Sequence, residues 1–272
     1  MKEIESVDIP FAAVNRAFTK QSMAYDLDDN QNPILQQMRQ QVYHHVSRYL
    51  KEKSKLLELN SGTGIDALHF VQQGHTVLAT DLSDGMISEI QKKINDSQPT
   101  NKFTCQQLSY DQLDRVIGNN FDYVFSNFGG LNCIADLSLV TKHLPKIVKP
   151  GGYVTWVIMP PIYLWELLWV FKGNVKQAFR RLNAKGTIAH LEGEYFKTYY
   201  HSLSQVKAAF GADFKFVRSE GLCSLLPPPS SSHFSSRHPN IYSLLQKVDS
   251  LVRSNYPFNR WADHLIITFQ KQ

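Results

Sequence analysis

The stretch Leu56-Leu57-Glu58-Leu59-Asn60-Ser61-Gly62-Thr63-Gly64-Ile65-Asp66 decides the fold, because an apolar run enters a turn of small residues and a helical run leaves it. Glycine is favoured in such a turn where a ligand approaches the backbone closely or where φ is positive. The helix that follows offers unpaired N–H groups and a partial positive charge at its N-terminus. The turn therefore predicts a ligand site, although it lacks the third glycine of the dinucleotide fingerprint.

A carboxylate follows the next predicted strand. Asp81 lies 17 residues beyond Gly64, and at the end of a second parallel strand it can accept hydrogen bonds from both ribose hydroxyls. The alternative is a cap for the next helix, for which Ser83 is better placed. Glu58 would repel a pyrophosphate but attract an amine, so the polarity of the site favours S-adenosylmethionine over NAD.

The rest of the chain alternates strand and helix. Strands are predicted at 55–59, 76–80, 103–107, 121–126 and 153–159. Helices are predicted at 65–73, 83–93 and 137–148. Later in the chain, helices are predicted at 203–210 and 241–253 and strands at 214–221 and 264–269. This alternation predicts an α/β fold with right-handed crossovers and a parallel sheet.

Two regions interrupt the alternation. Residues 1–50 show only helical spacing, with Pro33 in the first turn of the second helix and Asn32 as its cap. Residues 160–200 begin with an apolar helical stretch that then turns basic. We therefore expect a helical cap at 1–50, a cofactor-binding core at 51–159, an inserted helical lid at 160–200 and the C-terminal part of the core sheet at 201–272.

Composition sets broad limits. Of the 272 residues, 43% are hydrophobic, which supports a sizeable core and argues against disorder. The net charge of +5 is spread along the chain, so it permits nucleic-acid binding without predicting it. The three cysteines form no CxxC pair, and the N-terminus lacks the apolar stretch of a secretory signal. We expect a reduced, cytoplasmic protein without a metal site.

The apolar run 153–171 has the length of a membrane span. Pro160-Pro161 divides it, and its first half is β-branched. We interpret it as a buried strand ending near Met159 followed by an apolar helix, and we expect no membrane span.

These motifs, in this order, resemble those of the class I S-adenosylmethionine-dependent methyltransferases. Residues 56–64 resemble the first motif, with Asn60 at its first glycine. Asp81-Leu82-Ser83-x-x-Met86 resembles the second motif, in which the acid holds the ribose and the next apolar residue flanks adenine. Residues 121–127 resemble the fourth strand and its motif, and Lys149-Pro150-Gly151-Gly152 is similar to the turn before the fifth.

The resemblance covers roughly residues 55–160, and Ala262–Phe269 fits the antiparallel strand at the sheet edge. It implies a Rossmann-like, doubly wound, seven-stranded sheet, mostly parallel with an antiparallel last strand. Ala24-Tyr25-Asp26 also resembles the lead-in helix of the small-molecule, quinone-biosynthesis type, where this region closes over the cofactor.

The resemblance implies S-adenosylmethionine as the cofactor, bound at the C-terminal strand ends as in other open α/β sheets. The candidate cofactor-binding residues are Tyr25, Glu58, Asn60, Ser61, Gly62, Thr63, Gly64, Asp81, Leu82, Met86, Leu108, Ser109, Ser126 and Asn127. Ser109 stands where the family often has an aspartate that contacts the adenine amino group, and its hydroxyl could still accept a hydrogen bond.

The acceptor side is less defined. Asn132 could face the acceptor or cap a short helix after Gly129-Gly130. Trp165, with Trp169 and Phe171, could line an apolar pocket or pack on the N-terminal helices, and Tyr199 could supply a phenol. No general base is assigned, because one is needed only for a hydroxyl or weakly acidic carbon acceptor; the histidines in or near the lid are His190 and His201.

The sequence thus predicts a methyltransferase that acts on a small, largely apolar molecule by direct displacement, with no nucleic-acid partner. An RNA- or protein-directed methyltransferase is one alternative, prompted by the pI of 9.0. It is disfavoured because no basic run occurs. A non-catalytic cofactor-binding protein of the same fold is another, and the departures at Asn60 and Ser109 favour it. The sequence does not indicate an oligomeric state.

Overall fold

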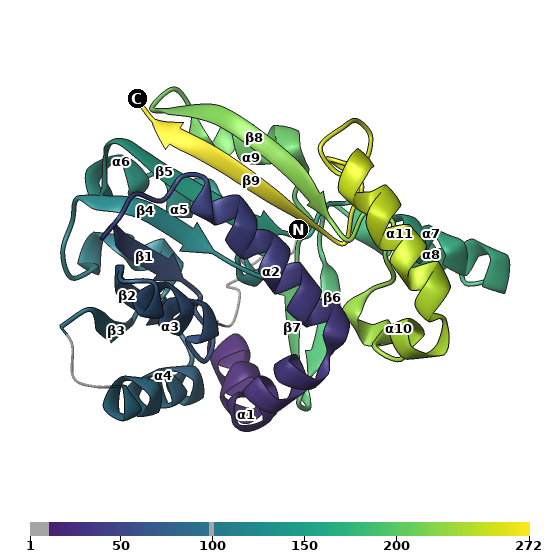
Figure 1. The fold of residues 1–272 in the computed structure, drawn as a ribbon, viewed down its shortest axis with the longest axis horizontal. Coiled ribbons are helices and arrows are strands. Elements are labelled where there is room, and N and C mark those ends of the chain that lie inside the picture. The colour runs from purple at the N-terminus through teal and green to yellow at the C-terminus, as the bar shows by residue number, and fades with distance from the viewer. Residues whose placement is uncertain (1–10, 98–100) are drawn as a thin grey trace, which may run out of the picture.

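The computed structural model describes residues 11–97 and 101–272. Its centre is a seven-stranded sheet (Figure 1). The strands are β1 Lys55–Leu59, β2 Thr76–Asp81, β3 Phe103–Gln107, β4 Phe121–Ser126, β5 Val148–Ile158, β8 Phe214–Leu222 and β9 His264–Lys271. Their order is β3-β2-β1-β4-β5-β9-β8, and β9 runs antiparallel to both neighbours. The expected Rossmann-like sheet with an antiparallel last strand is confirmed.

Both faces of the sheet are buried, as parallel strands require. Successive side chains point to opposite faces, so Leu57 and Ile267 join one core cluster while Leu56 and Ile266 join the other. The first face is covered by α5 Ser138–Thr141, α6 Leu144–Ile147 and α9 Leu203–Phe210. The second is covered by α2 Pro33–Ser47, α3 Ile65–Gln72, α4 Asp84–Asp96 and α11 Pro239–Val252.

Local signals explain several boundaries. Asn32 caps α2, since its Oδ1 accepts hydrogen bonds from the N–H groups of Ile34 (3.1 Å) and Leu35 (3.2 Å). The helix predicted at 137–148 is two short helices instead. Pro145 lies in the first turn of the second one, a position that proline tolerates but that separates it from α5.

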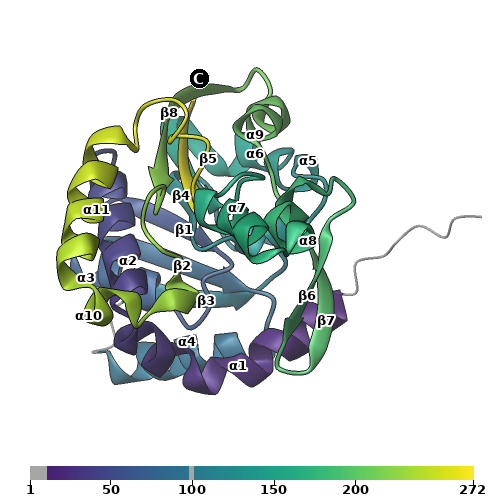
Figure 2. The same cartoon turned by 90° about the vertical axis from the view of Figure 1, so that its right-hand side faces the viewer.

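The segment 160–200 corrects the expectation of a helical lid. It holds α7 Leu164–Leu167, α8 Val175–Ala178 and the 3-10 turns η3 Leu168–Lys172 and η4 Arg180–Leu182, but its second half is a hairpin of β6 Thr187–Leu191 and β7 Glu194–Thr198. The hairpin lies beside α1 Phe11–Gln31 (Figure 2). Glu194 fixes this arrangement by accepting from Arg16 (3.0 Å) and Lys20 (2.9 Å) of α1.

The remaining elements are η1 Tyr110–Arg115, η2 Gly130–Cys133, η5 Pro229–Ser231 and α10 Phe234–Arg237. The apolar run 153–171 is divided between β5, α7 and η3. Over the described ranges, no helix combines the length and apolarity needed to cross a bilayer, and no group of three potential metal ligands is found there.

Candidate functional site

A cavity of about 340 Å³ lies at the C-terminal ends of β1, β2 and β4, which is within the size range of small-molecule sites. Its polar wall comprises Tyr25, Arg39, Asn60, Ser61, Gly62, Thr63, Asp66, Asp81 and Asn127. Its apolar wall includes Phe11, Val14, Phe18, Leu82, Met86, Leu108, Phe128, Cys133, Met159, Leu191 and Phe196. The cavity therefore has two chemically different sides.

The glycine turn forms the floor of the polar side. Gly62 has φ +56°, and no described atom lies within 4 Å of the place a Cβ would take, so the backbone there is open to a ligand. Gly64 has φ +81° and packs on α4, since a Cβ would lie 3.0 Å from Ile90. Asn60 adopts φ +45°, a conformation that asparagine tolerates.

Asp81 is held at the cavity wall by backbone donors. Its carboxylate accepts from the N–H groups of Gly62 and Ser83, both at 2.9 Å. Burial raises the pKa of Asp81 to about 6, although these donors oppose the rise. Ser83 itself caps α4 through Met86 (3.3 Å). The cap therefore belongs to Ser83, which leaves Asp81 facing the cavity.

A buried ion cluster beside the turn was not predicted from the sequence. Arg39 of α2 contacts Asp29 at 2.6 Å and also Asp66, and the Asp66 carboxylate accepts from Tyr43 (2.6 Å) and Asn127 (2.8 Å). Burial would lower the pKa of the guanidinium, but the two carboxylates raise it, so Arg39 stays charged. Its Nε has no partner among the described residues. The sequence feature that could have indicated this cluster is the charged residue Arg39, which stands among the buried apolar positions of α2.

Four of the candidate cofactor-binding residues lie behind the wall instead of in it. They are Glu58, Gly64, Ser109 and Ser126. Glu58 sits under the N-terminus of α3, and burial, reinforced by Asp66, raises its pKa well above the usual range. Glu58 is therefore placed behind the residues that line the cavity. The Ser109 hydroxyl donates to the Asp111 carboxylate, and the Ser126 hydroxyl donates to the side-chain carbonyl of Asn60 (2.8 Å).

None of the three acceptor candidates lines the cavity. Asn132 joins the end of β5 to the segment after β7. It donates to the carbonyls of Met159 (3.0 Å) and Tyr199 (2.6 Å) and accepts from the Met159 N–H (2.9 Å). Trp165 donates to the Leu225 carbonyl at 2.8 Å. The lining of the cavity therefore does not include Asn132, Trp165 or Tyr199.

The titratable side chains near the apolar wall do not form a catalytic pair. His201 is buried and its ring nitrogen contacts the Ile134 carbonyl at 2.9 Å. His190 reaches the cavity from β6 but is exposed, and its ring stacks on Tyr195. Burial raises the pKa of Cys133 to about 12, so its thiol stays protonated. Part of the apolar lining comes from α1 and from the hairpin, and the expected helical lid did not include this hairpin.

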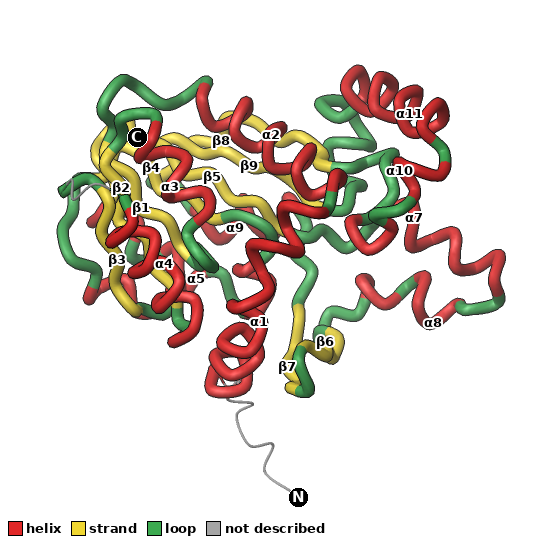
Figure 3. The backbone as a smooth tube through the Cα atoms, turned by 60° about the horizontal axis from the view of Figure 1, so that its bottom comes forward, coloured by secondary structure: helices red, strands yellow, loops and turns green. Residues whose placement is uncertain are grey.

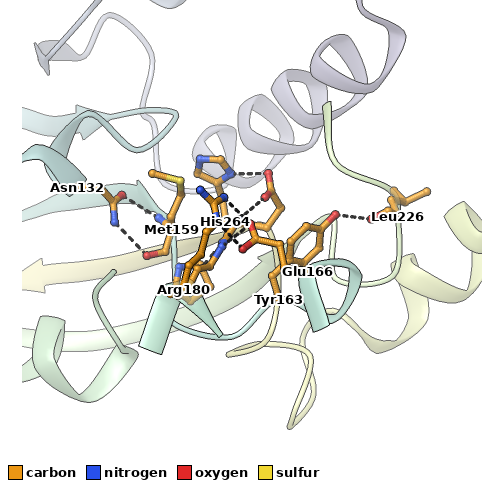
Figure 4. A network of polar contacts seen from close by, with 10 residues as sticks. Asn132, Met159, Tyr163, Glu166, Arg180, Leu226 and His264 are labelled. Atoms are coloured by element: carbon orange, nitrogen blue, oxygen red, sulfur yellow. Dashed lines mark hydrogen bonds and ion pairs between the residues drawn. The ribbon is translucent and has the colours of Figure 1, made fainter. Parts of the chain in front are cut away.

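A second polar cluster fixes the segment after β5 to the core (Figure 4). Glu166 accepts from Arg180 (2.8 Å) and Arg181 (2.8 Å), and Arg181 also contacts Asp263 at 2.8 Å. Asp263 in turn contacts the Nδ1 of His264 at 3.0 Å. Although burial raises the pKa of Glu166, the two arginines lower it below its usual value. Against the same effect of burial, His264 and Arg181 lower the pKa of Asp263, so both carboxylates remain charged.

Comparison with known proteins gives a consistent assignment. Residues 56–152 match the family described as a methyltransferase domain. The demethylmenaquinone methyltransferase of Corynebacterium glutamicum is 27% identical over 139 residues, which cover 48% of this chain and 53% of that protein. The glycine N-methyltransferase of Mus musculus is 28% identical over 110 residues, covering 36% and 38%. The matches thus span about half or less of these relatives.

Solved structures share the fold. The 1,6-didemethyltoxoflavin-N1-methyltransferase of Burkholderia thailandensis, solved with S-adenosylhomocysteine, superposes with a TM-score of 0.55 at 13% identity over 96% of this chain and 88% of that one. An S-adenosylmethionine-dependent methyltransferase of Mesorhizobium loti gives 0.53 at 15% identity, covering 84% and 97%. The chain thus matches a methyltransferase domain over residues 56–152, and it shares the fold of these solved methyltransferases.

Proposed function

We propose that this protein transfers the methyl group of S-adenosylmethionine to a small, largely apolar acceptor by direct displacement. The observation that carries the proposal is the two-sided cavity, in which a ribose-binding carboxylate and an open glycine turn face an aromatic and aliphatic wall. The names of two relatives, a demethylmenaquinone and a didemethyltoxoflavin methyltransferase, support a small-molecule acceptor.

The cavity residues fit the cofactor. Asp81 would accept the ribose hydroxyls, and the apolar side chains of Leu82, Met86 and Leu108 would flank the adenine. At the other end lies Arg39, a positive charge of the described lining that is already paired with Asp29 and Asp66. Burial raises the pKa of the neighbouring Tyr25 to about 12, so its hydroxyl remains a donor.

The chain then contributes positioning and exclusion of water. When bound, the cofactor supplies a methyl group already activated by a positively charged sulfur. Phe18 of α1 and Phe196 of β7 pack together over the apolar side, with ring centroids 6.0 Å apart. This cover would hold the acceptor in line with the methyl group. Burial raises the pKa values of Cys133 and Tyr110, so both groups stay protonated and cannot act as bases. We therefore expect an acceptor whose nucleophilic atom has a free lone pair without deprotonation by these residues.

We further propose that the four sequence-defined parts act as expected, with 1–50 and 160–200 covering a core formed by 51–159 and 201–272. The contacts of α1 with α4 and with the hairpin support the covering role. All three cysteines are free thiols, which is compatible with the reducing compartment proposed, the cytoplasm.

Calorimetric titration with S-adenosylhomocysteine tests the proposal. We expect Asp81→Ala to raise the dissociation constant by about tenfold or more, because hydrogen bonds to a charged acceptor contribute about 1.5–3 kcal/mol. Asp81→Asn should lie between it and the wild type, and the exposed Asp28→Ala on α1 serves as the control. An unchanged dissociation constant in a folded Asp81→Ala protein contradicts the assignment, and turnover with small apolar acceptors then tests the catalytic half.

A further inference from the structure

The segment from Leu168 to Leu182, here termed the apolar protrusion, exposes an unusual number of large hydrophobic side chains. It consists of η3, α8 and η4 and projects from the side of the molecule (Figure 3). Phe171 is 87% exposed and Val175 55%. The other exposed hydrophobic residues of the protrusion are Leu168, Trp169, Val170, Phe179 and Leu182. Single exposed hydrophobic residues are ordinary, but a contiguous group marks an interaction surface.

The charge of this surface has one sign. From Leu167 to Leu191 the chain contains no Asp or Glu but five Lys or Arg residues. Arg180 and Arg181 are neutralised by Glu166 and Asp263. Lys172 and Lys176 of the protrusion, and Lys185 just after it, are exposed and have no carboxylate partner in the described part of the chain.

We propose that the apolar protrusion docks on an anionic lipid bilayer. Aromatic and aliphatic side chains with interspersed lysines are the composition of interfacial segments, in which the apolar groups enter the acyl boundary and the ammonium groups stay at the headgroups. Trp169 is suited to this boundary, and Lys172 Nζ lies 4.8 Å from the centre of its ring. Each lysine near an anionic surface adds electrostatic attraction.

The charge pattern argues against the protein alternatives. A twofold contact through the protrusion would bring Lys172 and Lys176 of both copies into one interface, and the protrusion itself contains no carboxylate to pair with them. A peptide would need a groove, whereas this segment projects outward (Figure 3). A bilayer surface supplies both the apolar phase and the negative charge.

The protrusion is also anchored next to the cavity. At its base Arg181, only 5% exposed, joins Glu166 to Asp263 of the core. Asp263 contacts His264, whose Nε2 lies 3.2 Å from the Cβ position at Gly129, a residue of the cavity wall. Docking would therefore bring the acceptor side of the cavity near the lipid, a consequence that rests on the proposed function and deepens it to acceptors dissolved in the bilayer.

Vesicle co-sedimentation of the full-length protein tests the docking by itself. We expect binding to vesicles of phosphatidylcholine with added phosphatidylglycerol, weaker binding to phosphatidylcholine alone, and release by high salt. Both Trp169→Ser/Phe171→Ser and Lys172→Gln/Lys176→Gln should reduce the partition coefficient by about tenfold or more. The control is Leu244→Ser/Leu251→Ser, which removes two leucines of α11 that are 61% and 75% exposed.

Three results would overturn the proposal. The first is absence of binding to the anionic vesicles, and the second is an equal loss of binding in the α11 control. The third is a dimer in sedimentation equilibrium that Trp169→Ser/Phe171→Ser converts to monomer, which assigns the surface to self-association. Because the protrusion lies outside the polar wall, every variant should retain the wild-type affinity for S-adenosylhomocysteine. Loss of vesicle binding and failure of the methyltransferase assignment are thus distinguishable.

Discussion

Asn60 and Gly130 form a matched pair on neighbouring loops. Asn60 occupies the place of the first glycine of the motif, and its side chain donates to the Asn127 carbonyl (3.2 Å) and accepts from Ser126 (2.8 Å). A Cβ at Gly130 would lie 2.3 Å from the Asn60 Nδ2. The larger residue after β1 is therefore accommodated by the absence of a side chain after β4.

We expect Gly130→Ala to destabilise the protein by about 1–3 kcal/mol, the usual cost of overpacking. The same substitution in an Asn60→Gly background should cost much less, because the atoms it meets are gone. Urea denaturation of the two single variants and the double variant gives the coupling energy. Equal costs in both backgrounds would show that the two residues do not share this space.

The pKa of Asp81 predicts how cofactor affinity depends on pH. In the free protein this pKa is about 6, and ribose hydroxyls that donate to the charged carboxylate would lower it in the complex. Binding therefore releases a proton, so affinity for S-adenosylhomocysteine should increase as pH rises through 6 and then level off. Titrations across this range check it, and Asp81→Asn should remove the dependence.

The sequence predicts which residues line the cavity where their position is set by local chain geometry. Asp81 and Gly62 were predictable because a strand, a turn and a helix fix their positions within a short stretch. Arg39 was not, because its place at the cavity depends on how α2 packs on the sheet. The contacts of Asn132 were not predictable either, since its hydrogen bonds to Met159 and Tyr199 depend on chain segments 27 and 67 residues away.

At the scale of elements, the position of α1 over the cavity depends on close packing against α4. A Cβ at Gly85 would lie 2.6 Å from the Ser22 Oγ and 2.7 Å from the Thr19 carbonyl of α1. The Gly85 N–H also donates to the Thr19 hydroxyl at 3.1 Å. Backbone is among the atoms met, so a side chain at Gly85 can be accommodated only if α1 moves.

We predict that Gly85→Ala weakens binding of S-adenosylhomocysteine by about tenfold while the core stays folded, because α1 carries part of the cavity wall. Calorimetry with circular dichroism measures both effects. Ser88→Ala, on the exposed side of α4, is the matched control and should bind as the wild type does. Unchanged binding by Gly85→Ala would mean that the fit of α1 on α4 does not matter to the cavity.

The core strands were predictable because each is a short apolar run between turn residues, whereas the hairpin at 187–198 was not recognised. Its turn is Glu192-Gly193, where φ is +50° and +77°, the left-handed pair that a two-residue hairpin turn requires. Glutamate seldom adopts this conformation, so the pair is a weak signal. The apolar residues on either side were attributed to a helical lid.

At the scale of the whole molecule, a chain of buried polar groups crosses the sheet. Tyr123 of β4, Thr155 of β5 and Thr268 of β9 are joined by contacts of 2.6 Å and 2.7 Å. Thr268 continues to His45 of α2 at 2.8 Å, and His45 Nδ1 lies 3.3 Å from Glu220 of β8. This series of contacting side chains therefore connects β4, β5, β9 and the covering helix α2 to the buried carboxylate of Glu220.

Glu220 holds the charge at the end of this chain. Its carboxylate also contacts Arg48 and Arg218, each at 2.7 Å. Burial raises the pKa of Glu220, but His45 and Arg48 lower it more, to about 2. Burial lowers the pKa of His45, so near neutral pH the arginines carry the positive charge. Breaking the cluster leaves buried groups without their partners.

We expect Glu220→Gln to lower the free energy of unfolding by about 3 kcal/mol near neutral pH. Because the folded-state pKa is lower than the unfolded one, this stabilisation is present above about pH 4.5 and is lost as the pH falls toward 2. Urea denaturation across this range should show the free energies of unfolding of the wild type and Glu220→Gln converging.

Glu194→Gln is the control. Arg16 and Lys20 also lower the pKa of Glu194 to about 2, but these groups lie at the surface, where water screens them. A cost for Glu194→Gln as large as that for Glu220→Gln would contradict the view that burial gives the Glu220 cluster its strength.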